Sequence, residues 1–214
     1  MKKVFVFLAG ILLFTSCEKD PDMSELDSDF TVYTQYDEAA NFASASTYYL
    51  PDSILTTGSG MKAVYWKDDN AQSLLAQVAS EMALRGYVRT EEKAEADLGL
   101  QLTYVESTTQ VSGWVGGSGW GWDSWWYPGF WGPYYGMGWS YGFPVSYSYS
   151  TGSMVMEMVD LRTAPADTTE QVQLPVIWQA VSSGLLSGNA RLNLTLVGRA
   201  IDQAFTQSSY IKKD

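Results

Sequence analysis

The stretch from Gly119 to Phe143, GWGWDSWWYPGFWGPYYGMGWSYGF, is the feature that most constrains how this 214-residue chain folds. It carries a single charge, Asp123, and otherwise consists almost entirely of Trp, Tyr, Phe, Gly and Pro. Glycine and proline at this density disfavour both helices and strands. We therefore expect regular secondary structure on either side of a low-complexity insertion at residues 113–149.

Strands are predicted on both sides of this insertion. Runs of β-forming residues, most of them alternating between apolar and polar side chains, indicate strands. They occupy residues 30–36, 47–50, 97–104, 154–160 and 176–181.

Two amphipathic helices complete the predicted elements. The first has Asp69 or Asn70 as its cap and carries an apolar stripe that ends at Gly86. The second covers residues 190–205 with Asn189 as its cap, although the alternation at residues 192–196 also fits a strand. These elements predict an α+β domain of two layers: a mostly antiparallel sheet, two amphipathic helices and a long aromatic and Gly-rich loop insertion.

The first 17 residues have the layout of a bacterial lipoprotein signal. Lys2 and Lys3 precede a short apolar run, and small residues lead to Cys17, the only cysteine of the chain. The run is shorter than the roughly 20 residues that a membrane-spanning helix requires. Because residues 13–17, LFTSC, resemble a lipobox, we predict a signal peptide at residues 1–16 and attachment of acyl chains such as palmitate at Cys17.

An acidic, Pro-containing tether follows at residues 17–29. Its few apolar residues favour disorder. The acidic cluster directly after Cys17 resembles the signal that sends some Gram-negative lipoproteins to the outer surface, but it also fits a solvated linker. We expect a protein anchored by lipid to the outer membrane, on its periplasmic or its exposed face.

The remaining chain, residues 30–210, has the length of one domain. The full chain has a net charge of −11, and removal of Lys2 and Lys3 with the signal makes it −13, which argues against nucleic-acid binding. The chain contains no histidine, which excludes His-dependent nucleophiles and His-containing zinc sites. Together with the lack of a nucleophile motif, this favours a noncatalytic binding or structural envelope protein without cofactor or metal.

Carboxylates leave one alternative function open. Asp97, Glu157 and Asp160 lie on predicted strands, and a pair of carboxylates can hydrolyse glycosidic bonds. A carbohydrate-binding or carboxylate-based carbohydrate-active protein is therefore the alternative.

Aromatic side chains of the insertion are the candidate contact surface, since seven of the nine Trp residues lie there. Four interpretations stay open: a loop that folds onto its own domain, a contact with another envelope protein, insertion into the membrane interface, and stacking on a glycan. The candidate residues are Trp114, Trp120, Trp122, Trp125, Trp126, Trp131, Tyr134, Tyr135 and Trp139.

Six short motifs occur along the chain in a recognisable order: YDEAANF at 36–42, TYYLP at 47–51, LRGY at 84–87, ADL at 96–98, GSMVMEMVD at 152–160 and VIWQA at 176–180. In order and spacing they resemble the lipoprotein family called domain of unknown function 4136. Two positions depart from its pattern, because Glu157 stands where that family more often has Asp and Gln179 where it often has Arg. The resemblance implies an α+β envelope lipoprotein and no particular activity.

Overall fold

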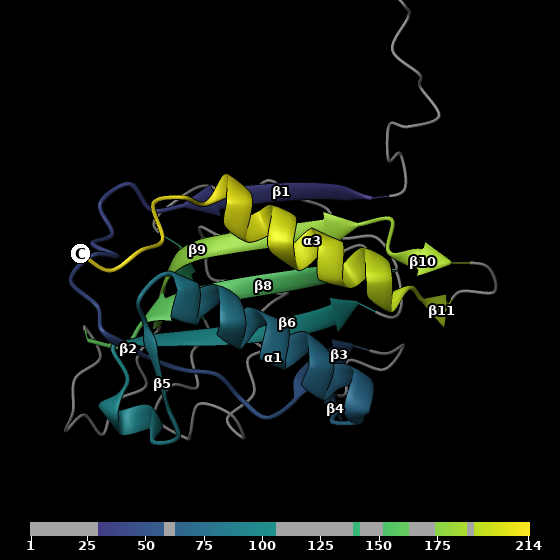
Figure 1. Ribbon diagram of the computed structural model, residues 1–214, viewed down its shortest axis with the longest axis horizontal. Coiled ribbons are helices and arrows are strands. Elements are labelled where there is room, and N and C mark those ends of the chain that lie inside the picture. Colours follow the sequence, from purple (N-terminus) through teal and green to yellow (C-terminus); the bar gives the residue numbers. More distant parts are fainter. Residues whose placement is uncertain (1–29, 58–62, 106–138, 142–151, 163–173, 188–190) are drawn as a thin grey trace, which may run out of the picture.

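The structure is a computed structural model that describes residues 30–57, 63–105, 139–141, 152–162, 174–187 and 191–214. These residues form a mixed, mostly antiparallel sheet of nine strands, a separate two-stranded ribbon and two helices (Figure 1). Both helices lie over the same face of the sheet. The predicted α+β class is therefore confirmed.

Three long antiparallel strands form the centre of the sheet: β6 (Leu98–Val105), β8 (Ser153–Asp160) and β9 (Leu174–Ser183). β6 and β8 pair along their whole length, with Tyr104 opposite Met154. At the end of this pair the Gly152 N–H donates to the Val105 carbonyl at 2.7 Å. The predicted insertion thus lies between two strands that are direct neighbours.

Two shorter strands flank β9 on its other edge. β1 (Thr31–Tyr36) runs antiparallel to the second half of β9, and β7 (Trp139–Tyr141) runs parallel to its first residues. β7 belongs to the insertion at 113–149, so the expectation that this insertion lacks regular structure is wrong at residues 139–141. β7 pairs at the end of β9 opposite to the residues that pair with Met154, so the insertion reaches both ends of β9. Backbone hydrogen bonding with an available sheet edge has overridden a weak local propensity.

Short strands extend the sheet beyond β6. β2 (Thr47–Tyr49) and β3 (Ile54–Thr57) both run parallel to β6, at its two ends. β5 (Val88–Thr90) pairs with β2, and β4 (Ala63–Trp66) pairs with β3.

The ribbon is made of β10 (Leu186–Ser187) and β11 (Arg191–Leu192). Of the strands in this and the preceding paragraph, only β2 was predicted. The others, β3, β4, β5, β10 and β11, have two to four residues, and such short runs show no measurable period.

Helix α1 (Asp69–Leu84) and helix α3 (Leu194–Gln207) match the two predicted helices, with different caps. Asp68, rather than Asp69 or Asn70, caps α1, since its Oδ1 accepts from the Ala71 N–H at 3.0 Å. Asn193, rather than Asn189, caps α3. Residues 191–192 form β11 and α3 begins at Leu194, so only residue 192 of the alternation at 192–196 lies in a strand. The other described helix is a single 3₁₀ turn, η1 (Lys93–Glu95).

The main core lies between the helices and the sheet. Trp178 of β9 is fully buried there, its Nε1 donates to Ser208 Oγ at 2.8 Å, and its ring lies 5.5 Å from that of Phe205. Alternate residues of β6 and β8 point into this core. They are Leu98, Leu100, Leu102, Tyr104, Met154, Met156 and Met158.

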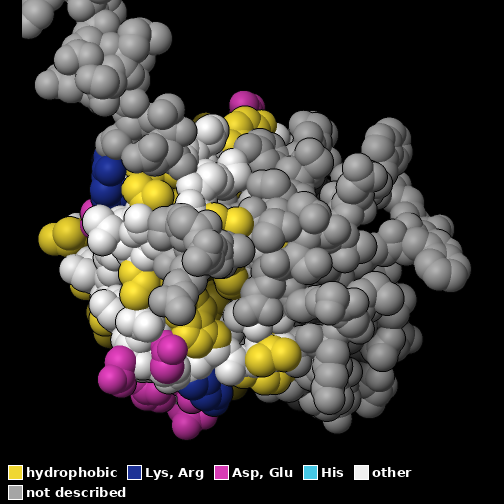
Figure 2. All heavy atoms as spheres, turned by 90° about the vertical axis from the view of Figure 1, so that its right-hand side faces the viewer, with side chains coloured by type: hydrophobic (Ala, Val, Ile, Leu, Met, Phe, Trp, Pro, Cys, Tyr) yellow, Lys and Arg dark blue, Asp and Glu magenta, His cyan; other side chains and the backbone are white. Residues whose placement is uncertain are grey.

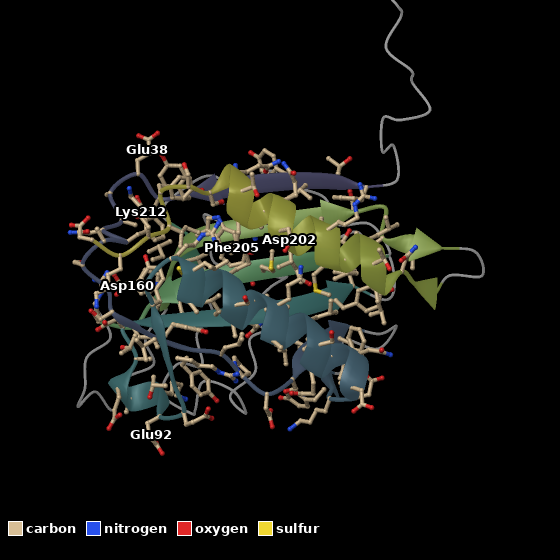
Figure 3. The ribbon with its side chains drawn as sticks, viewed as in Figure 1. Glu38, Glu92, Asp160, Asp202, Phe205 and Lys212 are labelled. Atoms are coloured by element: carbon tan, nitrogen blue, oxygen red, sulfur yellow. The ribbon has the colours of Figure 1, made fainter. Side chains whose placement is uncertain are left out.

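Polar contacts join the two helices. Figure 3 labels Asp202 and Phe205 on α3. Gln77 of α1 donates to Asp202 Oδ1 at 2.6 Å, and Arg85, just after α1, donates to the Phe205 carbonyl at 2.8 Å. The Arg85 guanidinium also lies 4.7 Å from the centre of the Phe205 ring. Among the described residues, no helix is long and apolar enough to cross a membrane.

Candidate functional site

The face of the sheet that points away from α1 and α3 is here called the helix-free face. Like the main core, it is buried. Every residue of β6 and β8 is buried on both faces. Besides Ala96, six buried apolar residues lie outside the main core, and none of these six is more than 1% exposed. They are Leu55, Val105, Val155, Val159, Val176 and Val181.

Four polar side chains cross this face in a single line, here called the polar row. Gln35 lies opposite Gln179, which lies opposite Glu157, which lies opposite Gln101, so the row spans β1, β9, β8 and β6. Gln179 Nε2 donates to Glu157 Oε1 at 3.0 Å. Gln179 thus binds the Glu157 carboxylate across the two strands, whereas Gln101 Nε2 donates to Thr103 Oγ1 on its own strand at 3.1 Å.

Burial of the polar row has an energetic consequence. Glu157 and Gln101 are each 4% exposed and Gln179 is 1% exposed. A buried carboxylate is costly unless hydrogen bonds compensate it. Because side chains alternate along a strand, a slip of one residue would turn Glu157 into the apolar core. The row thus favours one register of the central strands.

Only part of the polar row is apparent in the sequence. Glu157 was singled out as a carboxylate on a predicted strand, whereas the glutamines were not considered as site residues. Their signal is a glutamine within otherwise apolar strands, as in LGLQLTYV and VIWQAV. Which of these residues face each other depends on strand order, and that order comes only from the fold.

The other two candidate carboxylates lie apart from the polar row. Asp160 is on the side of β8 opposite to Glu157, and Figure 3 shows it at the end of the sheet. It accepts from the Arg162 guanidinium at 2.9 and 2.6 Å, and Arg162 also donates to Ser44 Oγ at 2.6 Å.

Asp97 accepts from the backbone N–H groups of Ser46 and Thr47 at 2.6 and 3.1 Å. Burial raises the pKa of the Asp97 carboxyl, but these hydrogen bonds, that of the Thr47 side chain and the charge of Arg162 outweigh burial and lower the pKa below its usual value. Asp97 and Asp160 hold separate segments of the chain together, so a structural role accounts for both.

The remaining predicted site residues lie mostly outside the described part of the chain. Cys17 and the aromatic candidates from Trp114 to Tyr135 are not among the described residues, whereas Trp139 begins β7, opposite Leu174 of β9. Within the described residues, no group of three or more His, Cys, Asp or Glu side chains is arranged to hold a metal ion.

Comparisons with known proteins place the chain in a family. The sequence model of the family "Domain of unknown function (DUF4136)" matches residues 32–208. A crystal structure of a DUF4136 family protein from Bacteroides thetaiotaomicron is 39% identical, with a TM-score of 0.72, over 88% of this chain and 100% of that one.

Another similar structure is the PelC dodecamer from Paraburkholderia phytofirmans, which is 15% identical with a TM-score of 0.40, over 86% of this chain and 99% of that one. A search of curated proteins finds no match. The match over residues 32–208 confirms the resemblance found in the sequence, and the chain belongs to the DUF4136 family.

Proposed function

We propose that this protein is an outer-membrane lipoprotein with a noncatalytic binding or structural role in the envelope, and that its aromatic insertion is the contact surface. The signal layout of residues 1–16 and the single cysteine at position 17 support the lipid anchor. The acidic tether at 17–29 then connects the lipid to β1, which begins at Thr31.

One observation carries the proposal for the insertion. The chain leaves β6 at Val105 and enters β8 at Ser153, which is the direct partner of Val105 in the antiparallel pair, and of the described residues between them β7 joins the sheet at β9. The central strands β6 and β8 therefore pair fully with each other, although the long aromatic segment is inserted between them in the sequence. Trp and Tyr combine flat apolar faces with polar edges, a combination suited to contacts with proteins, glycans and membrane interfaces.

Charge supports the choice of partner class. The net charge of −11 disfavours polyanions such as nucleic acid. Figure 2 views the end of the molecule that carries β10, β11 and the beginning of α1, and acidic side chains gather at its lower border. With a lipid anchor, the expected partners are the membrane, an envelope protein or a glycan.

Fractionation with acyl labelling tests the anchor. Cys17→Ala should abolish the acyl label and release the protein from the outer-membrane fraction. Cys17→Ala combined with Ser24→Cys is the matched control, because it restores a thiol outside the lipobox and should stay unlabelled. An unchanged label and unchanged fractionation of Cys17→Ala would refute the anchor.

Tryptophan fluorescence tests the contact surface. A blue shift with lipid vesicles indicates membrane insertion, and a shift only with envelope polysaccharide indicates a glycan site. A full-length variant in which Trp120, Trp122, Trp125 and Trp126 are serine should lose either response. A response that survives in this variant would show that the aromatic insertion is not the contact surface.

A further inference from the structure

The helix-free face is buried, yet α1 and α3 both lie over the opposite face (Figure 1). Val155 and Val181 at its centre are 0% exposed, and the neighbouring Glu157 is 4% exposed. A sheet face that meets water exposes its side chains, whereas these side chains do not. An apolar layer must therefore cover this face.

We infer that the covering layer is the chain's own segment 106–138, docked on the helix-free face. The two residues that flank this segment lie at opposite ends of the face. Val105 pairs with Ser153, whose neighbour Met154 lies opposite Ser182, whereas Trp139 lies opposite Leu174. Leu174 and Ser182 are eight residues apart on β9, a distance of about 26 Å along a strand.

The length of the segment is sufficient for this role. Residues 106–138 number 33, which can reach about 110 Å when extended. The segment can therefore pass over the central strands more than once between its two fixed ends.

The chemistry of the segment matches the face that it is inferred to cover. Valines surround a buried carboxylate and several amides on this face. Indole N–H and phenol O–H groups donate hydrogen bonds while their rings pack on apolar side chains. By contrast, the segment 163–173, TAPADTTEQVQ, is polar and would bring Asp167 and Glu170 toward Glu157. The aromatic segment is thus the better complement.

This inference goes beyond the proposed function and does not depend on lipid attachment. It states that the contact surface offered to a partner is the outer side of a docked layer rather than a free loop. Trp and Tyr rings held by a sheet lose less conformational entropy on binding than rings on a mobile segment, which favours affinity.

Thiol accessibility tests the inference. In a Cys17→Ser background the chain has no other cysteine, so one introduced thiol reports on one position. Val155→Cys should resist a thiol reagent in the full chain. Val64→Cys, at a position 54% exposed, should react fast, and Ala180→Cys, on the helix side and 0% exposed, should resist.

Replacing the segment's Trp120, Trp122, Trp125 and Trp126 with serine should then increase the reaction rate of Val155→Cys and leave that of Ala180→Cys low. Val155→Cys that reacts as fast as Val64→Cys in the unaltered segment overturns the inference. So does protection of Val155→Cys that persists with the serines, or that is lost on dilution, since the latter would indicate a second copy on this face.

Hydrogen exchange on the unaltered chain gives a second measurement if the serine variant fails to fold. Peptides from 106–138 should exchange more slowly than peptides from the tether at 18–29. Equal exchange of the two would overturn the inference. Because this readout needs no lipid, its failure is distinguishable from a failure of the membrane anchor.

Discussion

Gly152 closes the aromatic insertion, and its replacement by alanine is expected to destabilise the domain strongly. Its φ is +80°, in the left-handed region, and its N–H donates to the Val105 carbonyl at 2.7 Å. A Cβ at this position would lie 2.9 and 3.0 Å from the two terminal carbons of Leu186, and closer still to Leu186 Cγ. Alanine therefore meets both backbone strain and a steric clash.

The two effects can be estimated separately. The left-handed conformation costs an L-residue about 1–2 kcal/mol. Overpacking against a neighbour costs about 1–3 kcal/mol. The free energy of unfolding of Gly152→Ala should therefore be about 2–5 kcal/mol lower, a large part of the roughly 5–15 kcal/mol typical of a domain. Urea unfolding followed by circular dichroism should show a lower midpoint with an unchanged slope.

Two controls separate strain from clash. Gly86 has a φ of +88°, but the nearest atom to an added Cβ is the Lys213 Cβ at 3.3 Å. Gly86→Ala should thus lose only about 1–2 kcal/mol. Leu186→Ala should reduce the further cost of Gly152→Ala to a similar value, because it removes the clashing atoms. The reasoning is refuted if Gly152→Ala destabilises no more than Gly86→Ala.

Three further substitutions have expected effects on stability. Gln179→Leu removes a donor to the buried Glu157 carboxylate and should cost about 1.5–3 kcal/mol in urea unfolding, whereas the double replacement of both residues by leucine should cost less. Asp97→Asn should lower stability by about 1 kcal/mol at pH 7. Because the folded pKa of Asp97 is lowered, its contribution is present above the unfolded value of about 3.9 and is lost as the pH falls through the folded value, so thermal unfolding of the two proteins should converge at acidic pH. Arg85→Lys keeps the charge but loses the planar contact with the Phe205 ring, and it should cost about 1 kcal/mol of thermal stability; equal stability of the two proteins would contradict this contact.

The long elements were predictable from the sequence because their signals are local. The apolar stripe of α1 and the period of two in β6 and β8 depend on side chains a few residues apart. Cap positions were displaced by one to four residues, since Asp68 and Asn193 compete with nearby residues that have the same capping chemistry. The strand β3 has no local signal, because its stability comes from pairing with β6, about 50 residues away in the sequence.

The polar row was not predictable for a related reason. Gln35, Gln101, Glu157 and Gln179 are far apart in the chain, and they meet only because β1, β9, β8 and β6 are neighbours in one register. Sequence reasoning identified Glu157 from its type alone and grouped it with Asp97 and Asp160. Alternation along β8 separates Glu157 from Asp160, so the period that predicts the strand also shows that these two carboxylates face opposite ways.

The sign of one stability change decides whether the aromatic insertion belongs to the fold. The chain between Val105 and Ser153 is 47 residues long, and replacing residues 113–136 by an eight-residue Gly/Ser linker would shorten it to 31. The lower entropy of loop closure would stabilise the domain by only about 0.4 kcal/mol. If the segment covers the helix-free face, the same change exposes apolar side chains such as Val155 and Val181, each worth about 1.5–3 kcal/mol when fully buried. Urea unfolding should therefore show a loss of several kcal/mol, whereas a small gain would mean that the segment contributes nothing to the fold.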